Sequence, residues 1–250
     1  MNDNILLKLS LDAGEIMLAS GAETPRVEDT MRRILSIGNS EGVEAIALST
    51  LLMVSIPSKE QGSMTLTRRV EKRDLNFMKI CEVNALSRRL VAGELTPEVA
   101  TAFITDIRAT PSYPLWIRIL SYAIAAFGFC AMVNGSVLDS MVSVLTGGLT
   151  GTFVLLFRGQ GVPYFLQSFI GGVIAGAFAT IAKFLIPDLN LTTIIVGTIF
   201  PLLPGITITN AVRDIMEGNF ISGTSKLMEA CLLAVSIAGG VGLSFSLLPL

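Results

Sequence analysis

The sequence contains no histidine, and this absence removes the commonest general base and the commonest metal ligand of proteins. It also lacks a G-x-x-x-x-G-K segment followed by Ser or Thr, the pattern of the loop that binds nucleotide phosphates. Cysteine is rare: Cys81, Cys130 and Cys231 lie far apart and show neither a C-x-x-C pair nor zinc-ligand spacing. We therefore expect no metal and no other cofactor, and we interpret the three cysteines as small, buried, apolar residues.

Charged residues are also scarce: Asp, Glu, Lys and Arg make up 15% of the chain, against about 25% in typical soluble domains. The net charge of -2, without a basic stripe, gives no reason to expect a nucleic-acid partner. Residues 1–118 hold 14 of the 18 Lys and Arg and 15 of the 20 Asp and Glu, so residues 119–250 are nearly uncharged. This step in composition predicts a boundary between a domain of residues 1–112 and a domain of residues 113–250.

Long uncharged runs fill the second domain, and each approaches or exceeds the ~18–20 residues that a helix needs to cross about 30 Å of hydrocarbon. We predict five membrane-spanning helices, at residues 117–135, 138–157, 164–186, 190–212 and 226–249. Arg158, Arg213 and Lys226 then fall on the same side of the bilayer as the first domain. The positive-inside rule predicts that this domain is cytoplasmic and that the C-terminus lies outside.

The first domain shows the signals of helices at both of its ends. Apolar residues recur at a spacing near 3.6 in residues 3–20, and that helix is expected to end at Gly21. Thr24 is the expected N-cap of the next helix, with Pro25 in its first turn. The Thr-Pro helix start recurs at Thr96, near the end of the domain.

Between these helices the pattern changes to that of strands. Residues 43–57 and 63–70 are rich in β-branched and apolar residues, and the turn-forming residues 58–62 separate them. The expected order is α-α-β-β-β-α-α. The predicted fold class is therefore a membrane α-helical bundle of five transmembrane helices, preceded by a soluble N-terminal α+β domain.

The stretch "PLLPGITITN" interrupts the fourth predicted span. Pro201 and Pro204 remove two backbone N–H donors, and Gly205 permits a turn. Irregular backbone at membrane depth persists only where protein or a water-filled cavity covers it. Transporters use such helix breaks to bind polar solutes, so we interpret this one as part of a solute path.

Polar residues follow the break directly. Thr207, Thr209 and Asn210 are candidate substrate-binding residues, and Arg213 continues the face of Asn210 as a candidate partner for a solute carboxylate. The alternative is a kinked helix whose threonines bond their own backbone, with Arg213 and Asp214 marking the membrane interface. The pattern of residues alone leaves both interpretations open.

Two segments resemble the motifs of the threonine/serine exporter (ThrE-like) family: "LDAGEIMLASGAETPRVEDTMRRI" and "PLLPGITITNAVRDIMEGNFISGTSKLMEA". The resemblance spans nearly the whole chain. It implies export of threonine and serine in the full-length members, or of C4-dicarboxylates such as succinate in the split form. Full-length members carry a second membrane portion, and this chain ends at Leu250. We therefore expect the split, two-subunit (YjjP-like) form, with a short YjjB-like membrane protein as partner.

Charged residues near the two motifs are candidates for coupling or gating. Glu23, Arg26 and Glu28 cluster at the joint between the first two helices, where the alternative is an ordinary charged helix start. Asp214 and Glu229 are candidate proton carriers.

The interpretation we favour is a non-enzymatic subunit of a secondary transporter, driven by the proton gradient or by the solute's own gradient. Its expected partners are a small-molecule solute, the lipid bilayer, and a second subunit or another copy of itself. One alternative is a membrane-anchored regulatory or scaffolding protein that acts through residues 1–112. A membrane hydrolase is disfavoured because histidine and a G-x-S-x-G motif are absent, although Ser/Lys chemistry stays open.

Overall fold

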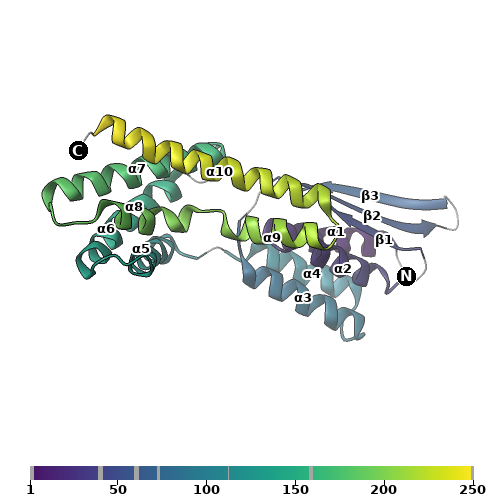
Figure 1. The fold of residues 1–250 in the computed structure, drawn as a ribbon. Coiled ribbons are helices and arrows are strands. Elements are labelled where there is room, and N and C mark those ends of the chain that lie inside the picture. Colours follow the sequence, from purple (N-terminus) through teal and green to yellow (C-terminus); the bar gives the residue numbers. More distant parts are fainter. Residues whose placement is uncertain are drawn as a thin grey trace. The chain divides into compact units, whose positions relative to one another are not determined.

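The computed structural model describes residues 3–38, 42–58, 62–71, 74–111, 113–157 and 160–248 (Figure 1). Arg158 and most of the expected turn at residues 58–62 lie outside these ranges. The chain is mostly helical and has one small sheet. It forms two compact units: unit 1 comprises Met1–Ser112 with Ile206–Leu227, and unit 2 comprises Tyr113–Gly205 with Met228–Leu250.

Unit 1 begins with the elements expected from the sequence, in the expected order. They are α1 (Asp3–Ala19), α2 (Thr24–Leu35), β1 (Glu44–Ala47), β2 (Leu51–Ser58), β3 (Gly62–Arg69), α3 (Phe77–Val91) and α4 (Pro97–Ala109). Most of α9 (Gly205–Met216) and the first turns of α10 (Phe220–Leu247) also belong to unit 1. The α-α-β-β-β-α-α order is thus confirmed.

The sheet is antiparallel in the order β1-β2-β3 and packs one face against α1 and α2 (Figure 1). Alternate residues of β2, Leu52, Val54 and Ile56, are buried on that face, as the two-residue period of a strand requires. Helix α1 is buried on most sides, and Gly14 brings it close to both neighbours. A Cβ at Gly14 would lie 3.2 Å from Leu52 Cδ1 and would overlap Met31. Each fully buried leucine in this core contributes about 1.5–3 kcal/mol.

The two Thr-Pro helix starts behave differently. Thr96 caps α4, because its hydroxyl accepts a hydrogen bond from the Val99 N–H. The expected N-cap at Thr24 was wrong: Glu23 occupies the N-cap position of α2 and gives no side-chain cap. The Thr24 hydroxyl has another partner, described below.

Unit 2 contains the long apolar helices: α5 (Leu115–Met132), α6 (Val137–Phe157), α7 (Tyr164–Leu185), α8 (Leu191–Ile199), the 3-10 turn η1 (Phe200–Leu202) and most of α10. In the described part of the chain, four helices are long and apolar enough to cross a membrane, namely α5, α6, α7 and α10. A fifth span results if α8–η1 and α9, bent by 58° at a short break, are counted together.

The expected loop between the fourth and fifth spans is mostly helical. Helix α9 continues to Met216 and α10 already begins at Phe220, so only residues 217–219 connect them. Gly218 makes this short turn possible through its positive φ of 86°. The predicted last span begins at residue 226, so the first turns of α10 precede that span and belong to unit 1.

Glycines let the helices of unit 2 approach closely. A Cβ at Gly151 of α6 would lie 2.6 Å from Tyr122 Cγ of α5, and one at Gly172 of α7 would overlap the backbone of Ile237 in α10. Large apolar side chains cover the outside of the unit, and Phe184 is 80% exposed. Such an apolar exterior is typical of a surface that faces lipid.

The cysteines depart from expectation. Cys130 is buried, but Cys81 and Cys231 are exposed, so the interpretation of all three as buried residues was wrong. Cys231 lies on α10, whose apolar composition does not distinguish a core face from an outer face.

Candidate functional site

The backbone leaves the helical conformation between η1 and α9. Pro201 lies in η1, and Leu203 adopts an extended conformation with φ -64° and ψ 140°. Pro204 follows, and the Gly205 N–H donates to the Leu203 carbonyl at 2.8 Å as α9 begins. The three residues singled out in the sequence, Pro201, Pro204 and Gly205, therefore lie at an interruption between two helical segments.

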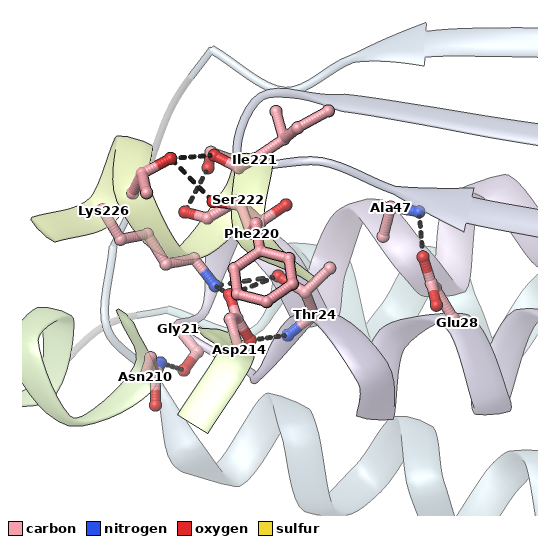
Figure 2. Close-up of polar contacts among 12 residues, drawn as sticks. Gly21, Thr24, Glu28, Ala47, Asn210, Asp214, Phe220, Ile221, Ser222 and Lys226 are labelled. Atoms are coloured by element: carbon pink, nitrogen blue, oxygen red, sulfur yellow. Dashed lines mark hydrogen bonds and ion pairs between the residues drawn. The ribbon is translucent and has the colours of Figure 1, made fainter. Parts of the chain in front are cut away.

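Helix α9 directs Asn210 and Asp214 toward the joint between α1 and α2 (Figure 2). Asn210 Nδ2 donates to the Gly21 carbonyl at 2.9 Å, and the Arg213 guanidinium forms an ion pair with the Glu23 carboxylate. Gly21 has a positive φ of 93°, which glycine adopts at little cost where a helix ends. The two sequence motifs, almost 190 residues apart, thus meet within unit 1.

Behind these contacts lies a cluster of three buried polar residues, Thr24, Asp214 and Lys226, hereafter the buried cluster (Figure 2). Lys226 Nζ donates to Asp214 Oδ2 at 2.6 Å and to Thr24 Oγ1 at 2.9 Å. The Thr24 hydroxyl donates to Asp214 Oδ2 at 2.9 Å, and the Thr24 N–H reaches Asp214 Oδ1 at 3.3 Å. Thr24 and Asp214 are 0% exposed, and Lys226 is 6% exposed.

The electrostatics of this cluster require all three members. Moving a carboxylate and an ammonium out of water costs several kcal/mol each, and only good geometry with extra hydrogen bonds offsets that cost. Here Asp214 has a cation and two donors from Thr24, so both of its oxygens are satisfied. Removal of any one member would leave a buried polar group without its partner.

The hairpin of α9 and α10 is held close around this cluster. A Cβ at Gly223 would lie 2.5 Å from Ile215 Cγ1 and 2.9 Å from the Ala211 carbonyl oxygen. The carbonyl of Ser222 accepts a hydrogen bond from the Ser49 hydroxyl at 3.3 Å, which ties α10 to the loop between β1 and β2.

The remaining candidate substrate and coupling residues occupy different places. Thr207 is half-buried and Thr209 exposed on α9, while Glu229 is half-buried one turn beyond Lys226 on α10. The exposed Arg26 lies 3.7 Å from the Glu23 carboxylate. The structure thus brings Asn210, Arg213 and Asp214 to the α1–α2 joint.

The pKa values of two glutamates at the joint, Glu23 and Glu28, are shifted in opposite directions. The hydrogen bond from Arg213 lowers the pKa of Glu23, against a smaller effect of burial. Burial raises the pKa of Glu28, although the Ala47 N–H donates to its Oε1 at 2.8 Å and opposes that shift.

Sequence reasoning missed Thr24 and Lys226 as site residues. Thr24 was interpreted as a helix cap and Lys226 as a marker of membrane orientation, because nothing local relates residues 202 positions apart. A hydroxyl beside a lysine could form a nucleophile–base pair. In this structure the pair is inaccessible to a substrate, and the lysine faces a carboxylate. No group of three or more Cys, Asp or Glu residues that could hold a metal ion occurs within the described ranges.

Comparison with known proteins relates the chain to membrane exporters. A family model described as "Putative threonine/serine exporter" (ThrE) matches residues 8–248. The "Threonine/serine exporter" of Corynebacterium glutamicum is 27% identical over 252 residues, which cover 97% of this chain and 51% of that protein. The "Probable threonine/serine exporter" of Mycobacterium tuberculosis is 24% identical over 241 residues, which cover 96% of this chain and 45% of that protein.

A third relative has a different name and length. The "Probable succinate transporter subunit YjjP" of Escherichia coli is 23% identical over 251 residues, which cover 96% of this chain and 93% of that protein. The chain therefore spans about half the length of the two exporters and most of the length of YjjP. No solved structure matches the chain. Because the family model matches nearly all of it and several helices are apolar enough to span a bilayer, the chain is a multi-pass membrane protein that belongs to the ThrE threonine/serine exporter family.

Proposed function

We propose that the chain is a subunit, or a portion, of a secondary transporter that exports small carboxylate-bearing metabolites across a bacterial inner membrane. The observation that carries this proposal is the interruption at residues 200–205, which lies within an apolar stretch and leads directly into Asn210, Arg213 and Asp214. The names of the relatives support two solute classes, the amino acids threonine and serine and the dicarboxylate succinate.

In this proposal five spans cross the bilayer, the bent pair α8–α9 being the fourth. Residues 1–112 form a cytoplasmic soluble domain, residues 113–250 form the membrane domain, and the C-terminus lies outside. One contact supports this topology: Asp139 Oδ1 accepts a hydrogen bond from the Asn190 N–H at 2.8 Å. The connections after α5 and α7 therefore meet at one end of unit 2, as two outer loops would.

Thr207, Thr209, Asn210 and Arg213 are the proposed substrate-binding residues. Because Arg213 is paired with Glu23 in this structure, the solute's carboxylate would compete with Glu23 for the guanidinium. Asp214 and Glu229, with Glu23, Arg26 and Glu28, are the proposed coupling or gating residues. The name of the YjjP relative, a transporter subunit, supports a second small membrane subunit as partner, alongside self-association.

Efflux measurements test the proposal. Cells that lack their own exporters, and that express the chain with any partner subunit, are loaded with a threonine dipeptide or with succinate. We expect Asn210→Ala and Arg213→Gln each to reduce efflux about tenfold, the effect of losing about 1.4 kcal/mol of binding. Arg33→Gln is the matched control, because Arg33 pairs with the exposed Asp29 within α2.

Wild-type efflux no higher than that of an empty vector, with all partners present, would contradict the transporter proposal. Normal efflux after replacement of both Pro201 and Pro204 by alanine would remove the role given to the helix break. That second result would favour the alternative of a membrane-anchored regulatory protein.

A further inference from the structure

Buried hydroxyl groups form a stripe along α6 inside unit 2. Ser143, Thr146 and Thr150 recur at helical spacing on one face of the helix, and each is at most 3% exposed. The Ser143 hydroxyl donates to the Ser140 carbonyl at 2.7 Å, and the Thr146 hydroxyl oxygen lies 3.3 Å from the Ser143 carbonyl oxygen. The Thr150 hydroxyl, which is fully buried, has no hydrogen-bond partner among the residues that the structure describes.

A buried hydroxyl without a partner is unusual in a helix of this kind. Leaving a polar group unpaired is costly, and hydrocarbon offers no water that could replace the missing hydrogen bond. A threonine normally avoids this cost by donating to the carbonyl four residues earlier. Thr152 of the same helix does so, with the Gly148 carbonyl at 2.8 Å. Thr150 does not, so its hydroxyl is available to a ligand.

The neighbouring turn of α6 meets a hydroxyl of α8. Thr146 Oγ1 lies 2.6 Å from Thr198 Oγ1, and Thr198 is 0% exposed. A hydroxyl group has one proton to donate and two lone pairs that accept, so a hydrogen bond between two hydroxyls uses one lone pair of four. The Thr146–Thr198 pair therefore keeps acceptor capacity for a further ligand. Thr146, Thr150 and Thr198 are hereafter the hydroxyl site.

The hydroxyl site lies level with the helix break. Thr150 is one turn beyond Thr146 and one turn before Val154, on the same face of α6. A Cβ at Gly171 of α7 would lie 3.1 Å from Val154 Cγ2 and 2.9 Å from Leu202 Cδ1, so these two side chains meet the same point of α7. The face of α6 around Thr150 therefore runs past the end of α8 and the turn η1.

The end of α8 decides the sign of charge that this place favours. Helix α8 ends here because Pro201 has no N–H and cannot donate to the Gly197 carbonyl four residues earlier. The C-terminal end of a helix carries a partial negative charge, which attracts cations and repels anions. Transporters use the C-terminal ends of broken helices to coordinate their ions.

We infer that the hydroxyl site, with the end of α8, binds Na⁺. Residues 140–157 and 189–205 contain no Asp, Glu, Lys or Arg, and Asp139 lies about 16 Å from Thr150 along α6. Mg²⁺ and Ca²⁺ are usually held by carboxylates, which this place lacks. Neutral oxygens can replace the hydration shell of a monovalent cation. Na⁺ suits the site better than K⁺, because the Thr146 and Thr198 oxygens, 2.6 Å apart, have to separate less for the smaller ion.

The position of the site gives the ion a coupling role. Bound Na⁺ would join α6 to the end of α8, and so would favour the conformations of the helix break in which these oxygens converge. Na⁺ would then take the place of the proton as the coupling ion of export. This coupling role rests on the proposed function, whereas Na⁺ binding to the hydroxyl site does not.

Binding of radioactive Na⁺ to the purified full chain in detergent micelles tests the site, with choline chloride keeping the ionic strength constant. We expect saturable binding that unlabelled NaCl displaces at lower concentration than KCl. Thr150→Val and Thr198→Val remove a hydroxyl at nearly constant volume, and each should raise the Kd for Na⁺ about tenfold. Thr150→Ser keeps the hydroxyl and should bind Na⁺ like the wild type. Thr152→Val is the matched control, because Thr152 bonds its own helix.

Three results would overturn the assignment. The first is the absence of saturable Na⁺ binding to the wild-type chain, which would mean that a water molecule satisfies Thr150. The second is displacement by KCl at the same concentration as by NaCl, and the third is unchanged binding in both valine variants. Thermal unfolding verifies that each variant keeps its fold. For the wild type it also gives a second test, because the Tm should rise as NaCl replaces choline chloride.

Efflux in sodium and choline media separates this inference from the proposed function. Na⁺ binding without any efflux would support the site and contradict the transporter. Efflux by a chain that does not bind Na⁺ would support the transporter and overturn the site. Na⁺ binding together with equal efflux in the two media would overturn the coupling role.

Discussion

Unit 1 and unit 2 each bury one aspartate, and the two carboxylates are satisfied by different means. Asp139 of unit 2 is 3% exposed and accepts hydrogen bonds from neutral donors: the Ser136 N–H at 2.9 Å, the Ser136 hydroxyl at 2.8 Å and the Asn190 N–H. Lys183 attracts it without a hydrogen bond among the described contacts. Asp214 of unit 1 is 0% exposed and has a cation, Lys226, beside it.

The difference separates a helix cap from an electrostatic cross-link. Ser136 and Asp139 bond to each other reciprocally at the start of α6, the arrangement of a capping box, and the helix dipole favours the negative charge there. Hydrogen bonds from neutral groups therefore satisfy Asp139 directly, and Lys183 adds only a longer-range attraction. Asp214 joins helices far apart in the sequence. Loss of its cation would leave a buried carboxylate without a counter-ion. The predictions below follow this contrast, from the largest effect to the smallest.

Removal of the buried cation should have the largest effect. Lys226→Met should destabilise the protein by about 3–5 kcal/mol, because it leaves the Asp214 carboxylate buried without its partner. Thermal unfolding in detergent, followed by circular dichroism, should show a Tm lower by roughly 10 °C. The double variant Asp214→Leu with Lys226→Met removes both charges and should recover most of this loss. A double variant as unstable as the single one would contradict the pairing.

Loss of the Thr24 hydroxyl should cause the second largest loss of stability. Thr24→Val removes the group that donates to Asp214 and accepts from Lys226, and should cost about 1–3 kcal/mol in the same unfolding measurement. Thr24→Ser keeps the hydroxyl and serves as the control, with a much smaller loss. Equal losses in the two variants would mean that packing, not hydrogen bonding, explains the position.

Substitution of Asp139, whose donors are neutral, should destabilise the protein less than either change in the buried cluster. Asp139→Asn keeps one acceptor oxygen and should cost about 1 kcal/mol. The buried Cys130, which lies against Gly135 just before α6, reports opening there if Cys81 and Cys231 are replaced by serine. A thiol dye should then label Cys130 about fivefold faster than without the substitution. A loss of global stability in Asp139→Asn as large as that in Lys226→Met would contradict the contrast between the two aspartates.

Substitution of Glu23 or Glu28 should change the Tm least. The contributions of the two glutamates to stability should depend on pH in opposite directions. Because Arg213 lowers the pKa of Glu23, its stabilisation is present above the usual glutamate pKa of about 4.3 and is lost as the pH falls through the lower folded value. Glu23→Gln should flatten this acid limb of a Tm-against-pH curve. Burial raises the pKa of Glu28, so its contribution falls as the pH rises from the usual value through the raised one. Glu28→Gln should accordingly raise the Tm slightly near pH 7, and a slight fall there would reverse the sign argued for Glu28.

The sequence predicted what is encoded locally. Apolar length predicted the ends of α6 and α7 to within one residue and those of α5 to within three. The richness in β-branched and apolar residues predicted the strands. The helical turns before the last predicted span were not predicted, because residues 222–226 are polar and resemble a loop. In the structure these residues are helical, and Lys226 pairs with Asp214 within unit 1.

The candidate site was predicted only in part. Thr24-Pro25 and Thr96-Pro97 are the same local signal, yet Thr96 caps its own helix and Thr24 turns to Asp214. No helix or strand period contains that information, because the choice depends on a residue 190 positions away.

Because the buried cluster excludes water, its residues can separate only slowly. Water must enter before the lysine and the aspartate can part, so separation belongs with local unfolding, on microseconds to seconds, and not with nanosecond loop motion. During faster fluctuations we expect the start of α2, the end of α9 and the first turns of α10, which the buried cluster joins within unit 1, to move together. If the proposed transport is correct, the ion pair would separate on the timescale of a whole transport cycle and not with each nanosecond fluctuation.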